Sequence, residues 1–370
     1  MSLEVQRDID QLPIIEVGSH PVRLIASNIR AKDEIDWRSF VIGPGRGYEG
    51  DLVLAEVTEV GARQEFEYLD GETIIDVPLM SGDLILGVLA NRHSGTSEYG
   101  EVPQEGLTIE KGTRLDLLAA GGIVGICLGV PKTLGTVPTR LEAIGLLNKP
   151  DNSPFQLTEL YPRWETELHP SVPIILSCGT AAEIGKTTTA KQLIASLYEA
   201  GTAQVGASKL AGTGRKRDIL SLKQVGARPA YDFPDVGLPT TYTRIERYTP
   251  AVYTLLNKIN RKNPAIIIAE CGGDIIEGNI PALLNDPNIM RYVVAIIHSS
   301  TDALGIWGSL DFYRKWGVSQ DKIYLTYPYR RNFTAIKERI NQLGVHLPIF
   351  DPLNHEEMQA VIQTILGRIF

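Results

Sequence analysis

The sequence predicts an α/β domain, with a parallel sheet and helices on both faces, preceded by a mostly β domain that forms a barrel or a sandwich. Two observations support this prediction. In the first part of the chain, short β-like runs follow one another between Gly, Pro, Asn and Asp residues, and helical stripes are scarce. In the second part, apolar runs of strand length alternate with amphipathic helical segments. We expect a β domain at 1–150, a linker at 151–172 and the α/β domain at 173–370.

The first domain offers strand signals and two loops that carry cations. Arg46 lies in a glycine-rich loop, and Arg92 and His93 lie in a polar one. These cations could hold an anion, but solvated loops are the favoured interpretation. The glycines between Gly121 and Gly125 indicate close packing of strands rather than a dinucleotide fingerprint. The strands expected in this domain are 13–17, 22–26, 40–42, 52–57, 73–77, 84–89 and 123–128.

The strongest functional signal lies at residues 173–191. A short apolar run fits a buried strand, the chain turns between Gly179 and Gly185, and an amphipathic helix begins at Lys186. Loop N–H groups and the helix N-terminus bind a phosphate in such an arrangement, while Lys186 adds a positive charge and the Thr187 hydroxyl ligates Mg²⁺. Five residues separate the two glycines, one more than in a standard Walker A loop. The expected nucleotide contacts are Gly179, Thr180, Glu183, Ile184, Gly185, Lys186, Thr187 and Thr188.

Polar residues also end the next two expected strands. Ligands of parallel α/β sheets bind at the carboxyl ends of the strands, so these residues are candidates for the same site. The second strand ends at Lys209, and a basic glycine-containing segment leads from it to Asp218. The third strand ends at Glu270, where a Walker-B-type carboxylate binds Mg²⁺ or orders a water. The alternatives are that Asp218 caps a helix and that Glu270 is a buried structural acid.

The remaining elements of the α/β domain follow from the same alternation. Strands are expected at 174–177, 204–209, 265–269, 293–298, 322–326 and 346–350. Helices are expected at 187–199, 250–259, 310–316, 334–343 and 355–366.

The loop from Gly179 to Thr187 resembles the phosphate loop of dethiobiotin synthetase, which also has five residues between its glycines and a Glu before the second. Lys209, Asp218 and Glu270 extend the likeness to that family and to its relative cobyrinic acid a,c-diamide synthase. The resemblance covers residues 172–370 and implies a P-loop NTPase-type domain. It implies that Thr187, Asp218 and Glu270 share a Mg²⁺, and that Lys186 and Lys209 contact phosphates or an acyl phosphate.

Three departures from that family affect what the resemblance implies. Ala181 stands where the family has an Asp, and the base-recognition segment is not matched at 327–332, so ATP rather than GTP is an assumption. The β domain has no counterpart in dethiobiotin synthetase. A similar loop also occurs in uncharacterised bacterial P-loop proteins of similar length, which leaves the substrate open.

The leading functional hypothesis is an ATP- and Mg²⁺-dependent enzyme that activates a carboxylate or carbamate by phosphoryl transfer for C–N bond formation. Lys186, Lys209 and Glu270 are its expected catalytic residues, and a small acidic molecule is its expected substrate. One alternative is a small-molecule or polynucleotide kinase. In such an enzyme the basic run 215–217 would bind a phosphorylated acceptor. The other is a nucleotide-switched dimeric ATPase or GTPase, for which the chain lacks Cys/His ligands and a second loop lysine. By resemblance, we expect a homodimer.

Composition narrows the classes of partner. Apolar residues make up 43% of the chain and charged residues 22%, as in ordinary globular proteins. A formal net charge of -8 argues against a general nucleic-acid or membrane-surface binder. The three cysteines show no metal-ligand spacing, and no signal peptide or membrane-spanning apolar run is evident. We therefore expect a cytoplasmic protein with reduced thiols and no membrane or nucleic-acid partner.

Overall fold

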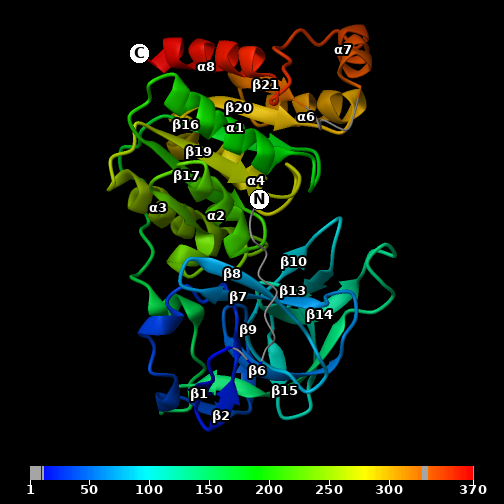
Figure 1. Cartoon of the computed structure of the whole chain (residues 1–370), viewed down its shortest axis with the longest axis vertical. Coiled ribbons are helices and arrows are strands. Elements are labelled where there is room, and N and C mark those ends of the chain that lie inside the picture. Colours follow the sequence, from blue (N-terminus) through cyan, green and yellow to red (C-terminus); the bar gives the residue numbers. More distant parts are fainter. Residues whose placement is uncertain (1–9, 11, 327–331, 370) are drawn as a thin grey trace. The chain divides into compact units, whose positions relative to one another are not determined.

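A computed structural model describes residues 10, 12–326 and 332–369, and it divides into two compact units (Figure 1). The β unit comprises residues 1–163 together with 213–217 and 233–242, and the α/β unit comprises 164–212, 218–232 and 243–370. This division differs from the expected one at 151–163, which pack with the β unit, and at the two short segments that return to it. No local sequence pattern predicts that these two segments pack with the β unit, because long-range contacts define it.

A closed ring of strands forms the centre of the β unit. The main sheet has the order β10-β11-β14-β13-β15-β6-β9-β3, and an additional parallel pairing of β14 with β9 closes β9, β14, β13, β15 and β6 into a ring. Separate two-stranded sheets are formed by β1 with β2, β5 with β12, and β7 with β8. The buried apolar core of this unit includes Leu52, Leu54, Leu86, Val88 and Leu117. The mostly β character that the sequence predicts is confirmed.

The elements of the β unit are short, and 3-10 turns connect several of them. Its strands are β1 (Ile15–Val17), β2 (His20–Val22), β3 (Leu24–Ile25), β4 (Val41–Gly43), β5 (Gly45–Gly47), β6 (Leu52–Glu59), β7 (Glu65–Asp70), β8 (Thr73–Pro78), β9 (Leu84–Leu89), β10 (Arg92–His93), β11 (Tyr99–Glu101), β12 (Leu107–Ile109), β13 (Arg114–Ala119), β14 (Ile123–Gly129) and β15 (Thr139–Asn148). The 3-10 turns are η2 (Lys32–Glu34), η3 (Trp37–Ser39), η4 (Leu157–Leu160) and η5 (Phe233–Val236).

Seven strands of this unit lie outside the ranges expected from the sequence: β5, β7, β10, β11, β12, β13 and β15, of which β7, β13 and β15 are the longest. In β13 and β15 the buried residues alternate with exposed ones over part of the strand, so charged residues interrupt the apolar run. This period-two pattern is typical of strands with one solvated face, and it does not show up as a continuous apolar run.

The α/β unit is built on one six-stranded sheet with the order β18-β17-β19-β16-β20-β21, and every pairing in it is parallel. On one face, Val205 and Ala207 pack in the core formed with α1, α2 and α8. Gly206 points to the opposite face, where a Cβ would lie 3.2 Å from the Ile259 side chain of α3. Helices therefore cover both faces, and the predicted P-loop α/β architecture is confirmed.

Most of the expected elements of this unit are present, but two helices begin at 245 and 303 rather than at 250 and 310, and the elements at 216–224, 230–232, 280–285 and 287–290 lie outside the expected ranges. Its strands are β16 (Ile174–Gly179), β17 (Val205–Ala211), β18 (Ala230–Asp232), β19 (Ile266–Cys271), β20 (Val293–Ser299) and β21 (Ile323–Thr326). Its helices are α1 (Lys186–Glu199), α2 (Lys216–Gln224), α3 (Ile245–Asn260), α4 (Ile280–Asn285), α5 (Pro287–Met290), α6 (Ala303–Lys315), η6 (Gln320–Lys322), α7 (Phe333–Gln342) and α8 (His355–Ile369).

Two local expectations for this unit were wrong. The strand expected at 346–350 is reduced to an isolated bridge between Leu325 and Ile349, because this segment makes only that one parallel bridge to β21. Asp218 is not the cap of α2, since the helix begins two residues earlier at Lys216 and places Asp218 in its first turn. Among the described residues, none of the helices combines the length and apolar character needed to cross a bilayer.

Candidate nucleotide site

The loop between β16 and α1 has the backbone geometry of a tight phosphate cradle. Gly185 precedes the helix with φ +92° and Glu183 has φ +59°, so the loop uses left-handed conformations at two positions. A Cβ on Gly179 would lie 2.8 Å from the Ser299 carbonyl oxygen, which explains the need for glycine there. Thr180 N donates to that same carbonyl at 3.0 Å. The loop is therefore held against β20 while it leads into the N-terminus of α1.

Lys186 is buried at the first position of α1, with 5% of its surface exposed. Its Nζ donates to the carbonyl oxygen of Ala181 within the loop and, at 2.7 Å, to that of Gly273 after β19. Burial lowers the pKa of Lys186, and the Glu270 charge opposes this effect. Both hydrogen-bond acceptors are neutral, so the ammonium group brings a positive charge to the loop that a phosphate can neutralise.

Glu270 lies at the end of β19, where the sequence analysis placed it, and contacts the loop helix directly. Thr187 Oγ1 donates to Glu270 Oε1 at 2.9 Å. Glu270 Oε2 is buried and has no hydrogen-bond partner among the described residues. Burial raises the pKa of Glu270, while the Lys209 charge lowers it and the Asp218 charge raises it further. An orphaned carboxylate oxygen in a buried site is costly unless a cation satisfies it.

Lys209 and Asp218 form an ion pair beside this carboxylate. Lys209 is in register with Glu270 across β17 and β19, and its Nζ contacts Asp218 Oδ2 in the first turn of α2. Burial alone would lower the pKa of Lys209, but the Asp218 and Glu270 charges raise it above its ordinary value. Lys209 is therefore protonated at neutral pH, and the structure brings it together with Lys186, Thr187, Asp218 and Glu270.

The donor set fits Mg²⁺. Thr187 offers a hydroxyl and Glu270 and Asp218 offer carboxylates, which are the hard oxygen ligands that this ion prefers. No cluster of three or more His, Cys, Asp or Glu side chains suited to a metal occurs in the described ranges. Mg²⁺ usually takes one or two carboxylates and completes its octahedron with water and substrate phosphates.

The structure also shows polar residues at this edge that the sequence analysis passed over. Ser300 follows β20, and its hydroxyl lies 3.4 Å from that of Thr180 in the loop. Asp302 caps α6 by accepting from Gly305 N at 2.8 Å. The rule that polar residues ending a strand mark the site was applied to β17 and β19, and its application to β20 would have found Ser300.

The other candidate residues of the sequence analysis lie in the β unit. Arg46 is exposed and donates to Glu105 O and Thr108 Oγ1, and His93 stacks on Tyr99 and contacts Glu101. The segment 327–331, considered for base recognition, lies outside the described residues. The loops that contain Arg46 and Arg92 belong to the β unit, whereas the phosphate loop belongs to the α/β unit.

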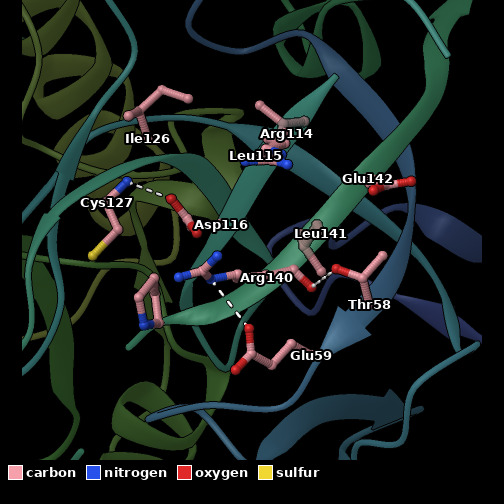
Figure 2. A pocket seen from close by; sticks show the side chains of 11 residues that line it. Thr58, Glu59, Arg114, Leu115, Asp116, Ile126, Cys127, Arg140, Leu141 and Glu142 are labelled. Carbon is pink, nitrogen blue, oxygen red and sulfur yellow. Dashed lines mark hydrogen bonds and ion pairs between the residues drawn. The ribbon is translucent and has the colours of Figure 1, made fainter. Parts of the chain in front are cut away.

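The cysteines do not supply a nucleophile. Cys178 and Cys271 are fully buried, and a hydrogen bond with Cys178 together with burial raises the pKa of the Cys271 thiol well above its ordinary value. Cys127 lines a pocket of about 510 Å³ on the β unit, where burial raises its thiol pKa as well (Figure 2). The charged residues of that pocket bond within the protein: Arg140 contacts Glu59 at 3.3 Å, and Asp116 accepts from Cys127 N at 2.8 Å. Arg114 and Glu142 line the same pocket with opposite charges, so its lining has no large excess of positive charge for a phosphate.

The all-parallel sheet, the phosphate loop and the helix after it define the α/β unit as a P-loop NTPase-fold domain. No family model matches the sequence, and no curated protein matches it. Solved structures similar to about half of the chain include a DUF1611 family protein from Anabaena variabilis (17% identity, 55% of this chain and 63% of that chain, TM-score 0.35). Another is HypB from Helicobacter pylori in complex with nickel (14% identity, 54% of this chain and 87% of that chain, TM-score 0.29). A third is a plasmid partition protein from Borrelia burgdorferi (12% identity, 54% of this chain and 100% of that chain, TM-score 0.37). The chain thus spans less than two thirds of the first of these proteins.

Proposed function

We propose that the chain is an ATP- and Mg²⁺-dependent enzyme that activates a carboxylate or carbamate by phosphoryl transfer for C–N bond formation. The observation that supports this most directly is the partly buried Thr187–Glu270 hydrogen bond, which leaves Glu270 Oε2 without a hydrogen-bond partner among the described residues. The same site contains two buried lysines, and hydrolysis by a simple P-loop needs only one of them. The second, Lys209, is suited to an anionic group beyond the nucleotide.

Each residue has a distinct role in this proposal. Bound MgATP supplies a γ-phosphoryl group, whose transfer to a carboxylate gives an acyl phosphate that an amine nitrogen attacks with release of phosphate. Lys186 and the loop N–H groups stabilise negative charge on the phosphates. Thr187, Asp218 and Glu270 offer oxygen ligands to the ion, and Asp218 Oδ2 also holds the protonated Lys209 in place. The expected homodimer stays a prediction.

The test is ATP turnover by the full chain, with and without pools of carboxylates and amines. Lys186→Ala and Glu270→Gln should each lower turnover by about 100-fold or more, the usual loss when one charge-stabilising group is removed. Lys191→Ala removes a lysine from the same helix α1 outside the loop and should keep turnover within about twofold. Binding of a fluorescent ATP analogue by each variant separates a loss of nucleotide affinity from a loss of chemistry.

The acceptor requirement decides between the proposed function and its alternatives. Turnover that depends on a carboxylate and yields an amide supports the proposal. Transfer to a hydroxyl or phosphate acceptor would replace it with a kinase, and slow hydrolysis that no acceptor stimulates would replace it with a nucleotide switch. Equal nucleotide binding by wild type and Lys186→Ala would remove the basis of all three.

A further inference from the structure

A second polar site lies within the β unit. A pocket of about 370 Å³ is lined there by Arg63, Gln64, Glu65, Thr133, Leu134 and Arg215. Arg215 belongs to this unit through the segment 213–217, one of the two that return to it from the second half of the chain. The pocket therefore combines residues 150 positions apart in the sequence, which is why the sequence analysis did not connect them.

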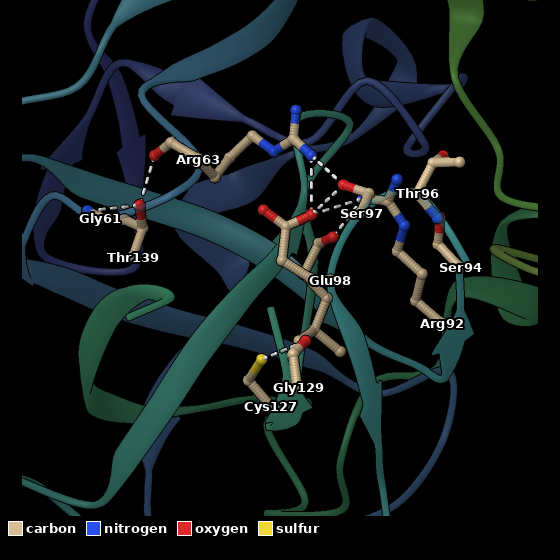
Figure 3. Close-up of polar contacts among 11 residues, drawn as sticks. Gly61, Arg63, Arg92, Ser94, Thr96, Ser97, Glu98, Cys127, Gly129 and Thr139 are labelled. Atoms are coloured by element: carbon tan, nitrogen blue, oxygen red, sulfur yellow. Dashed lines mark hydrogen bonds and ion pairs between the residues drawn. The ribbon is translucent and has the colours of Figure 1, made fainter. Parts of the chain in front are cut away.

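Arg63 is held in one orientation by buried partners (Figure 3). Its Nη2 donates to Ser97 Oγ at 2.6 Å and to Glu98 Oε2 at 2.7 Å, and the Glu98 side chain is fully buried. Its main-chain oxygen accepts from Thr139 Oγ1, which in turn accepts from Gly61 N at 2.9 Å. A guanidinium that is fixed in this way loses little conformational entropy when it binds an anion.

Arg215 is held in a similar way by a second buried acid. Its Nε lies 3.5 Å from Glu67 Oε2, and the Glu67 side chain is fully buried. Glu67 Oε1 accepts from Ser27 Oγ at 2.6 Å and from Lys216 N at 2.8 Å, so its position is fixed by the protein. The Nε atom of Arg63 is buried without a hydrogen-bond partner among the described residues, and that of Arg215 has only its ion-pair contact with Glu67.

The charges of this cluster do not cancel. Arg92 Nη1 shares Glu98 Oε2 with Arg63 at 3.2 Å, and burial lowers the pKa of Arg92 only to about 10, so it is charged at neutral pH. Burial would raise the pKa of Glu98, but hydrogen bonds from Arg63 and Ser97 bring it below its ordinary value. Three guanidinium groups thus face two buried carboxylates, which leaves one positive charge in excess. Glu65 also lines the pocket and brings the formal charge to zero, but its carboxylate is exposed, so water screens it and the excess positive charge remains beside the buried acids.

We propose that Arg63 and Arg215 form a binding site in the β unit for a small molecule that bears a carboxylate group. The planar guanidinium fork matches a carboxylate in geometry, and a single carboxylate balances the one excess charge. This site is additional to the nucleotide site. If the proposed function holds, the carboxylate bound here is the acceptor of phosphoryl transfer. The binding of a carboxylate at this site does not depend on the proposed function.

The test uses the full chain labelled with ¹⁵N-arginine and titrated with glutarate in the absence of nucleotide, at constant ionic strength. Glutarate should shift two arginine Nε–H resonances saturably, and Arg63→Lys and Arg215→Lys, which keep the charge but not the fork, should assign them and weaken binding at least tenfold. Leu134→Trp narrows the pocket without changing charge and should also weaken binding. Arg114→Gln, in the separate 510 Å³ pocket, should leave it unchanged.

Two outcomes would overturn this site: no saturable shift with glutarate, or equal binding of glutarate and inorganic phosphate, which would indicate only a general attraction of anions. A separate titration of the same samples with MgATP keeps the two proposals apart. If the wild type binds MgATP but not glutarate, the carboxylate site alone is refuted. If the wild type binds glutarate but not MgATP, the proposed function is refuted while the carboxylate site stands.

Discussion

At the scale of single residues, burial in the central strands determines which side chains carry charge. His298 in β20 is fully buried beside Cys178 in register, and its Nδ1 lies 2.9 Å from the Tyr313 hydroxyl. Its Nε2 has no partner among the described residues, and burial lowers its pKa to about 3. His298 is therefore neutral in the folded protein at neutral and mildly acidic pH.

This burial makes stability depend on pH. His298 is protonated near pH 6.5 in the unfolded chain but only near pH 3 in the folded chain. Its contribution to the unfolding free energy is therefore complete above pH 6.5 and is lost as pH falls from 6.5 towards 3. Between pH 7 and pH 5 the wild type should lose about 2 kcal/mol of unfolding free energy from this residue. Urea unfolding at both pH values measures it.

His298→Gln, which keeps a polar side chain of similar size but does not titrate, is the matched variant for this measurement. It should be less stable than the wild type at pH 7, and its stability should fall by about 2 kcal/mol less between pH 7 and pH 5. An equal fall in both proteins would show that His298 is not responsible.

At the scale of elements, glycines set how closely strands approach. Gly122, in the turn before β14, has φ +90°, and a Cβ there would lie 2.3 Å from Ala26 Cβ and 2.8 Å from Ala26 Cα. Neither of these atoms can swing away as the end of a flexible side chain could. The close packing that the sequence analysis inferred for Gly121 to Gly125 is confirmed by this contact.

Replacement of Gly122 by alanine should therefore lower the unfolding free energy by about 3 kcal/mol or more, from backbone strain and overpacking together. Gly82→Ala is the control, because Gly82 has a similar φ of +96° but open space around its Cβ position. Gly82→Ala should lower the unfolding free energy by about 1 kcal/mol, from backbone strain alone. Thermal or urea unfolding of the two variants measures the difference, and equal losses would contradict a steric role for Gly122.

At the scale of the whole molecule, the two units are interleaved along the chain. The β unit is completed by residues 213–217 and 233–242, which bring Lys216 N to Glu67 and a Gly214 carbonyl within 2.9 Å of a Cβ built on Gly121. A fragment that ends at residue 163 lacks both segments. Its Glu67 would then be a buried acid without two of its partners.

The fragment 1–163 should consequently be less stable than the β unit in the full chain, by about 3–5 kcal/mol, as expected when a buried charge loses its partner. A full chain with a protease site inserted after Arg163 provides the control. After cleavage its two pieces should still elute together in size-exclusion chromatography, because the second piece completes the β unit. A fragment 1–163 as stable as the β unit of the intact chain, or pieces that separate, would contradict this view.

The sequence by itself determined the parallel P-loop fold and much of the candidate nucleotide site, because these are local. A strand, a glycine loop and a helix adjoin one another, and the edge of a parallel sheet brings Lys209 and Glu270 into register as soon as their strands pair. Asp218 was found for the same reason, although its place inside α2 was not. The period-two strands β13 and β15 were within reach of the sequence and were missed.

Only the tertiary structure decided the ring closure, the division into units and the arginine cluster. The pairing of β14 with β9, the return of 213–217 to the β unit and the meeting of Arg63 with Arg215 all join residues far apart in the chain. No local pattern encodes such contacts, because they depend on how the whole apolar core packs. For the same reason, the lack of a hydrogen-bond partner at Glu270 Oε2 and at Arg63 Nε among the described residues is evident only once every neighbour is in place.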